Sequence, residues 1–210
     1  MKNNMRLFKT MVTCLLLAAF TFCSAQNRNS TKKALLIMDM QVPILKGMPG
    51  DVLSPVAKAA EFARKNDITV IYVRATMRQG APEINTNNKF FDEHRVALEN
   101  VDVDAWSAIP SQIAPKKGDL IVDKRRFSSF EGTDLEIILR SKGYSELILC
   151  GVMTSGVVLS TVRDAADKDY KITVLSDACA DPNPETNDFL MKKIFPLQAN
   201  VISTQQWITQ

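Results

Sequence analysis

Residues 146–165 read ELILCGVMTSGVVLSTVRDA, and this stretch decides the fold class. Its first five residues form an almost entirely apolar run, which is typical of a strand buried on both faces of a sheet. Val158, Val162 and Ala165 then recur at helical spacing, so we expect a helix over 155–168. A buried strand that leads directly into a helix is the repeating unit of a parallel α/β sheet.

The same alternation runs through the rest of the chain. The expected strands are ALLIMD (34–39), ITVIYV (68–73), DLIVD (119–123), ELILC (146–150), KITVLS (171–176) and NVIST (200–204). The expected helices are 52–66, 133–142, 155–168 and 185–194. This pattern predicts a single α/β domain of three layers, α/β/α, with a mainly parallel six-stranded sheet of the Rossmann type.

One long connection does not follow the alternation. Residues 75–118 contain the polar run NTNNK, then FFDEHRVALEN, which favours a helix, and then a loop with Pro110 and Pro115. A connection of this length usually has a function, so we expect it to form a wall or a lid of a pocket.

The first 25 residues have the pattern of a signal peptide. Lys2, Arg6 and Lys9 precede the apolar run MVTCLLLAAFTF, which is short for a membrane span, and Ser24-Ala25 offers small residues for cleavage. We therefore expect an exported protein, periplasmic or secreted. Lipid anchoring at Cys23 is the less favoured alternative, because the bulky Phe22 precedes it.

The expected mature chain has a polar lead-in at 26–31 and one domain at 32–210. The whole chain has 26 Lys and Arg residues and 23 Asp and Glu residues, and the three cations of the signal peptide account for the difference. A balanced mature chain gives no reason to expect a nucleic acid or a membrane surface as a partner. We expect a small molecule as the partner, and one chain leaves a homo-oligomer open.

Two cysteines, Cys150 and Cys179, remain after signal removal. Export permits a disulfide between them. Both lie in or beside apolar runs, however, so the sequence favours buried free thiols.

The residues directly after each strand are the first candidates for a site, because ligands of open parallel sheets bind beyond the carboxyl ends of the strands. The first strand delivers Asp39 and Gln41, and the third delivers Lys124 with Arg125 and Arg126. The fourth delivers the turn 151–156, in which Thr154 and Ser155 are expected to cap the following helix. A carboxylate, an ammonium and a helix N-terminus together predict acid/base and anion-binding chemistry.

A simpler interpretation gives these residues no function. Asp39 can cap a loop and Lys124 can be a solvated cation, and only their convergence in space decides. His94 is the one histidine of the chain and stands among charged residues, which favours a solvated helix face over a catalytic triad. The sequence contains no cluster with metal-ligand spacing, no GxGxxG and no GxxxxGK[ST], so we predict no metal and no cofactor.

At these residues the chain resembles the isochorismatase-like hydrolases, which include nicotinamidases and N-carbamoyl amidohydrolases. The resemblance covers almost all of the expected mature chain and rests on three segments in the same order. They are LLIMDMQ (35–41), VDKRRFSSFEGTDLEIILRSKG (122–143) and GVMTSGVVLSTVRDAADKDYKITVLSDACAD (151–181).

The resemblance implies Asp39 and Lys124 as the catalytic acid/base and its electrostatic partner. It implies a substrate site formed by Gln41, Val152, Met153, Ser155, Gly156 and Val157. It also implies a cis peptide bond between Val152 and Met153, beside backbone N–H groups that bind an oxyanion.

The chain departs from the family at the nucleophile. The family segment resembles G-V-A-T-D-x-C-V, and Val157 stands at the cysteine position. Valine has no lone pair, so covalent hydrolysis through residue 157 is excluded. Cys150, Ser155 and Ser160 lie nearby in sequence, but a replacement nucleophile needs an activating base that a Lys-paired Asp does not supply.

Two hypotheses remain open. True isochorismatases also lack this cysteine and cleave a vinyl ether without a covalent intermediate, which predicts an exported hydrolase with Asp39 as the acid. The alternative is a catalytically silent protein that uses the same pocket to bind a small ligand.

Overall fold

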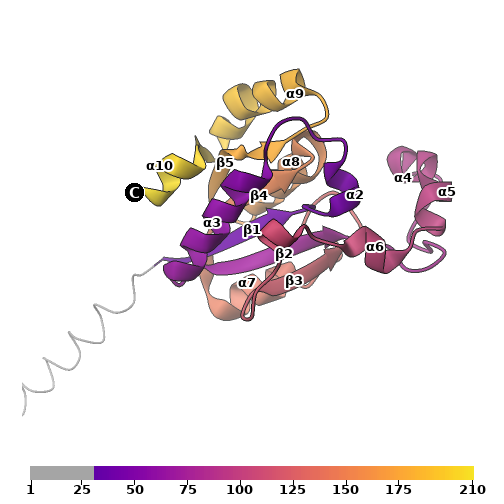
Figure 1. The fold of residues 1–210 in the computed structure, drawn as a ribbon, viewed down its shortest axis with the longest axis horizontal. Helices are drawn as coiled ribbons and strands as arrows, with labels where there is room; N and C mark the ends of the chain where they lie inside the picture. The colour runs from indigo at the N-terminus through magenta and orange to yellow at the C-terminus, as the bar shows by residue number, and fades with distance from the viewer. Residues whose placement is uncertain (1–30) are drawn as a thin grey trace, which may run out of the picture. The chain divides into compact units, whose positions relative to one another are not determined.

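The computed structural model describes residues 31–210, and the expected signal peptide at 1–25 and most of the lead-in at 26–31 lie outside them. A parallel sheet runs through the described part of the chain (Figure 1). Its strands are β1 (Lys32–Met38), β2 (Thr69–Ala75), β3 (Leu120–Lys124), β4 (Tyr144–Val152), β5 (Lys171–Ala180) and β6 (Asn200–Ile202). All six strands expected from the sequence are present.

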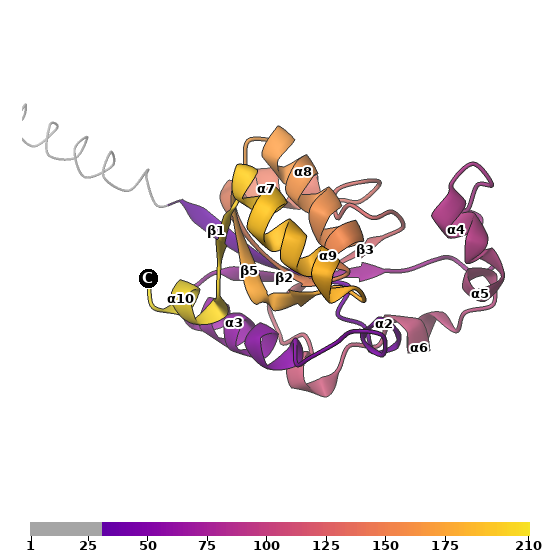
Figure 2. The ribbon, with the colours of Figure 1, turned by 90° about the horizontal axis from the view of Figure 1, so that it is seen from above.

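Helices connect the strands and cover both faces of the sheet. The α-helices are α2 (Val42–Leu45), α3 (Leu53–Lys65), α4 (Lys89–Glu93), α5 (Arg95–Glu99), α6 (Val103–Ser107), α7 (Leu135–Lys142), α8 (Leu159–Asp167), α9 (Pro184–Phe189) and α10 (Thr204–Ile208). The 3-10 helices are η1 (Ser111–Ile113) and η4 (Phe195–Leu197), and the π-helices are η2 (Thr154–Val158) and η3 (Leu190–Ile194). In Figure 2, α3 and α10 lie on one side of the sheet and α7, α8 and α9 on the other. The three-layer prediction is therefore confirmed.

The helices bury the faces that their sequences predict. Val56, Ala59, Ala60 and Ala63 of α3 are buried. Residues 34–38 of β1 are at most 1 % exposed, because helices pack on both sides of this central strand. A strand whose residues are all apolar has to be buried on both faces of the sheet.

The strand order places a crevice beside β1. The order is β3-β2-β1-β4-β5-β6, with every neighbouring pair parallel. The chain winds outward from β1 in one direction up to β3 and then returns to the other side of β1 with β4. Such a reversal opens a crevice at the carboxyl ends of the two central strands, where ligands bind. Asp39 follows β1 and η2 follows β4, so both stand at this crevice.

Gly151 fixes how closely β4 approaches β1. Its φ is +134°, and a Cβ atom at this position would lie 2.1 Å from the backbone oxygen of Met38. Met38 is the register partner of Gly151 and immediately precedes Asp39. A side chain at 151 therefore displaces the strand end that carries Asp39.

We expect Gly151→Ala to lower the free energy of unfolding by more than about 4 kcal/mol, because both the backbone conformation and the space exclude a methyl group. Gly143→Ala is the matched control: its φ is +72° but no atom lies within 4 Å of the added Cβ. The control is expected to lose only about 1 kcal/mol. Urea unfolding measures both, and equal losses in the two variants contradict the close approach.

Candidate active site

Asp39 stands where β1 ends and the chain turns. Its φ is +53°, a left-handed conformation that aspartate tolerates better than most residues. Its backbone N–H donates to the carbonyl of Val73 at 2.8 Å, which ties the turn to β2. The side chain is buried, with the residue only 4 % exposed.

Lys124 reaches Asp39 across an intervening strand. Lys124 ends β3, and β2 lies between β3 and β1. Neighbouring strands are about 4.8 Å apart, so the side chain must span two such spacings. The long lysine stem is suited to this distance, and the register partner of Lys124 on β2 is the small residue Ala75.

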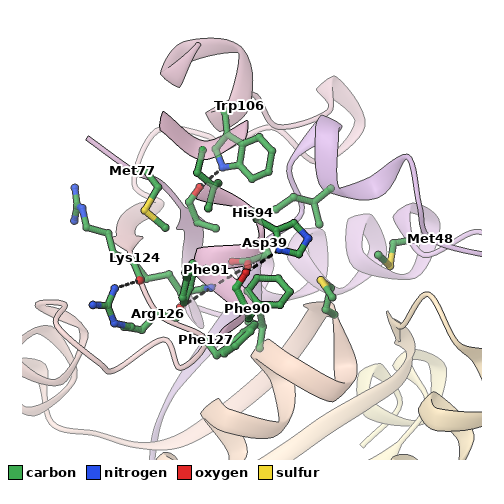
Figure 3. Close-up of a pocket in the computed structure, with 16 residues that line it drawn as sticks. Asp39, Met48, Met77, Phe90, Phe91, His94, Trp106, Lys124, Arg126 and Phe127 are labelled. Atoms are coloured by element: carbon green, nitrogen blue, oxygen red, sulfur yellow. Dashed lines mark hydrogen bonds and ion pairs between the residues drawn. The ribbon is translucent and has the colours of Figure 1, made fainter. Parts of the chain in front are cut away.

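The two side chains form a buried ion pair (Figure 3). Lys124 Nζ donates to Asp39 Oδ2 at 2.9 Å and to the backbone oxygen of Arg126 at 3.0 Å. The predicted convergence of the first and third strand ends is therefore present.

Burial sets the proton affinity of Asp39. Loss of hydration raises the pKa of its carboxyl above the usual value, and the charge and hydrogen bond of Lys124 oppose this effect without cancelling it. Asp39 Oδ1 is buried and has no hydrogen-bond partner in the described part of the chain. The carboxyl group therefore has a free oxygen on which it can hold and deliver a proton.

The pair lies at an apolar cavity of about 310 Å³. The lining is mainly aromatic and aliphatic, a setting that favours the neutral form of a carboxyl group. The lining residues are Asp39, Ile44, Met48, Ala75, Met77, Phe90, Phe91, His94, Leu98, Trp106, Lys124, Arg125, Arg126, Phe127, Met153 and Val157.

The long connection after β2 supplies the outer wall, as its length predicts. Phe90 and Phe91 of α4 pack against Phe127, with ring centroids 4.9 and 5.6 Å apart. His94 stacks on Phe90 at 4.5 Å, and its Nδ1 lies 2.8 Å from the Phe90 carbonyl oxygen. The prediction that His94 is solvent-exposed holds, but this residue also lines the cavity.

The predicted substrate residues divide into two groups. Met153 and Val157 line the cavity, whereas Gln41, Val152, Ser155 and Gly156 are not among the lining residues. The ring of Phe127 packs over Gly156, 3.1 Å from where a Cβ would stand.

Gln41 has a structural position instead. It is 0 % exposed, and its amide donates to the backbone oxygens of Ala75 at 3.0 Å and Trp106 at 2.8 Å. Its Oε1 accepts from the N–H of Ala75 at 2.7 Å. Gln41 thus holds α6 against the end of β2, which positions Trp106 in the cavity wall.

The turn after β4 differs from the expectation in three respects. The helix begins with the π-helical turn η2, in which the N–H groups of residues 156–158 all donate to the Met153 carbonyl at 2.9–3.3 Å. Asp181 Oδ2, not a capping hydroxyl, accepts from the Ser155 N–H at 2.7 Å, and Thr154 Oγ1 donates to Asn187 Oδ1. The Thr154 and Ser155 caps are therefore wrong, and Asp181 takes the place of an anion at this helix end.

The expected cis bond between Val152 and Met153 is also wrong, since every peptide bond of residues 31–210 is trans. Trans is the default for a bond that does not precede proline. The N–H groups of residues 155–158 all have acceptors within the protein, so these four donors are not free for an oxyanion.

Neither cysteine of residues 31–210 lines the cavity. Cys150 and Cys179 are free thiols, as the sequence favours, and both are buried. Burial raises the pKa of Cys150 well above its usual value and that of Cys179 to about 12. Ser155 and Ser160 are not lining residues either, so none of the replacement nucleophiles stands at the ion pair.

In the part of the chain that the structure describes, no group of histidine, cysteine or acidic residues has the arrangement of a metal site. Within the same residues, no helix has the length and apolar character needed to cross a membrane.

Comparison with known proteins shows the family. The model of the isochorismatase domain matches residues 33–206. The chain belongs to the isochorismatase family.

Relatives in this family bear different names. The chain is 30 % identical over 186 residues to a probable isochorismatase of Pseudomonas chlororaphis, covering 83 % of this chain and 84 % of that protein. It is 32 % identical over 168 residues to a probable inactive nicotinamidase of Arabidopsis thaliana, covering 72 % and 82 %. The crystal structure of a cysteine hydrolase from Pseudomonas syringae pv. phaseolicola is similar, with a TM-score of 0.76, 25 % identity and coverage of 85 % and 92 %. The chain is thus an isochorismatase-family hydrolase by similarity, and its own site must decide the chemistry.

The sequence predicted that residues 75–118 form a wall, but it did not single out most of the side chains that line the cavity of this family member. The residues are Met48, Met77, Phe90, Phe91, Leu98, Trp106 and Phe127. They lie in the segments that connect the strands, so the folding of these connections, and not the strand pattern, brings them to one cavity. The available signal was the FFDEH run, in which Phe90 and His94 stand at helical spacing.

Val157→Cys tests whether the cavity activates a thiol. Val157 and Lys124 line the same cavity, so we expect the new thiol to react with iodoacetamide at least about tenfold faster than Cys150 or Cys179. The two buried native thiols are internal controls. Peptide mass spectrometry identifies the labelled residues, and equal rates at 157 and 179 contradict this description of the site.

Proposed function

We propose that this isochorismatase-family protein hydrolyses a small molecule with an apolar body, without a covalent enzyme intermediate and with Asp39 as the general acid. The observation that carries the proposal is the unpartnered Oδ1 of Asp39 at an apolar cavity that contains no thiol. A carboxyl group of raised pKa in such a place is suited to donate a proton.

A vinyl ether is the type of substrate that Asp39 and Lys124 are suited to hydrolyse. Asp39 transfers its proton to the enol carbon, and the carbon–carbon double bond becomes an oxocarbenium ion. Water adds to that ion and returns a proton to Asp39, and the resulting hemiketal breaks into a carbonyl compound and an alcohol. Lys124 stabilises the Asp39 carboxylate during the interval in which it has lost its proton.

The site is less suited to the hydrolysis of an amide. It needs a nucleophile and donors for a tetrahedral oxyanion, but residue 157 is a valine and the N–H groups of residues 155–158 are engaged. The protein of Pseudomonas chlororaphis, a probable isochorismatase, is the relative whose name agrees with this choice. Val157 then acts only as a wall of the cavity.

The second candidate is a silent ligand-binding protein. It is favoured by the engaged N–H groups and by the likeness to a probable inactive nicotinamidase. A thermal shift produced by small acids, with no turnover of any amide or enol ether, supports this candidate.

Export remains part of the proposal. Its support is the signal pattern of residues 1–25, which lie outside the described residues. A small molecule as the partner is proposed from the size and apolar lining of the cavity.

We expect Asp39→Asn to lower kcat on an enol ether by at least about 100-fold, because the amide cannot supply the proton. The active form of Asp39 is the protonated acid, and its pKa is raised. The rate should therefore persist above the usual aspartate range and decline as the pH rises through the pKa of Asp39.

Asp123→Asn is the matched control. Asp123 directly precedes Lys124 but pairs with Arg74 at the surface, so turnover should stay within about twofold of the wild type. Steady-state kinetics with circular dichroism separates chemistry from folding. Unchanged turnover in Asp39→Asn, or a rate that rises through the same pH range, removes Asp39 from the mechanism.

A further inference from the structure

The cavity has more cationic than anionic side chains in its lining. Lys124, Arg125 and Arg126 follow one another at the end of β3, and all three line the cavity. Asp39 is the one acidic lining residue among the described residues. The question is which of the three cations lacks a partner within the protein.

Two of the three cations have carboxylate partners. Lys124 pairs with Asp39. Arg125 Nε lies 3.0 Å from Glu83 Oε1, an ion-pair contact without hydrogen-bond geometry, and Glu83 also pairs with Arg78.

Arg126 has no carboxylate partner among residues 31–210. Its Nη1 donates to the backbone oxygen of Arg125 at 2.6 Å and its Nη2 to that of Glu83 at 3.1 Å. Its guanidinium carbon also lies 5.6 Å from the centroid of the Phe91 ring. Carbonyl oxygens satisfy donors but do not cancel a full charge, so this partly buried cation remains uncompensated.

The contacts also fix the guanidinium in place. Two carbonyls and an aromatic ring hold the planar group, while three of its five N–H donors have no partner among residues 31–210. A held guanidinium with free donors is suited to bind a carboxylate in a two-point contact. The cation excess persists when Asp39 is protonated, because Lys124 then also lacks a negative partner.

We propose that Arg126 binds a carboxylate of the substrate, whose apolar body fills the cavity between the Phe127 ring and Val157. This inference rests on the proposed function, since it names the substrate class of the same cavity: an apolar molecule with one anionic group. In Figure 3 Lys124 and Arg126 approach from the same side of Asp39, so the anchor and the acid belong to one site.

Binding of three probes with one shared body tests the assignment. Phenylacetate is anionic, 2-phenylethanol is neutral and 2-phenylethylamine is cationic. Calorimetry gives the affinities, and fluorescence of Trp106 reports whether a probe enters this cavity, because Trp106 is in its wall. The wild type should bind phenylacetate at least about tenfold more tightly than 2-phenylethanol, with 2-phenylethylamine weakest.

Arg125 provides the matched control, because it contacts the Glu83 carboxylate, whereas Arg126 contacts no carboxylate among residues 31–210. Arg126→Gln should remove the preference for phenylacetate and leave the affinity for 2-phenylethanol within about twofold. Arg125→Gln should retain the preference. Arg126→Lys, which keeps the charge but not the two-point geometry, should lose several-fold in phenylacetate affinity and covers the case in which Arg126→Gln does not fold.

The assignment is overturned if the wild type does not prefer phenylacetate, if Arg126→Gln or Arg126→Lys binds it as the wild type does, or if Arg125→Gln loses as much affinity as Arg126→Gln. Binding without a change in Trp106 fluorescence also overturns it, because Arg126 borders a second, open hollow beside α8. The same titration on Asp39→Asn separates the two proposals. Asp39→Asn should lose turnover and still prefer phenylacetate, whereas a wild-type protein without turnover that prefers phenylacetate refutes the acid mechanism and leaves the Arg126 subsite intact.

Discussion

The ion pair between Asp39 and Lys124 is the interaction on which the site depends. It joins the ends of β1 and β3 across β2, so it forms only when three parallel strands are in register. Removing one partner of a buried pair leaves an uncompensated charge, which typically costs about 3–5 kcal/mol. The position of the Asp39 carboxyl group at the cavity therefore depends on the register of β1, β2 and β3.

Opposing effects on Asp39 explain how one carboxyl group can serve as an acid. Burial favours the neutral form, and Lys124 favours the charged form, with burial the larger effect. The cavity wall beside Asp39 includes side chains of α4, α5 and α6, and Gln41 holds α6 in place. Val157 adds an inert surface in place of a nucleophile. The long connection after β2 thus contributes apolar lining to the cavity, which favours the neutral form of the Asp39 carboxyl group.

The sequence predicted the scaffold better than the site. All six strands, the three layers and the buried thiols followed from apolar runs and helical spacing, because burial on both faces of a sheet leaves a strong periodic signal. The rule that sites form at the carboxyl ends of parallel strands also predicted that Asp39 and Lys124 lie close together. The turn after β4 was not predictable in detail: that Asp181 accepts from the Ser155 N–H and that Met153 accepts three N–H groups depends on contacts between distant segments. Gln41 was assigned to substrate binding because it follows Asp39 closely, yet its amide bonds to the backbone of β2 and α6.

To act as the general acid, Asp39 must keep its proton at a pH where an ordinary aspartate has lost it. Carbon-13 NMR of the side-chain carboxyl groups, with Asp39→Asn to assign the resonance, measures this directly in the protein without ligand. We expect a titration midpoint for Asp39 above the free value of about 3.9. A midpoint at or below that value would show that Lys124 outweighs burial, and Asp39 could then not act as the acid.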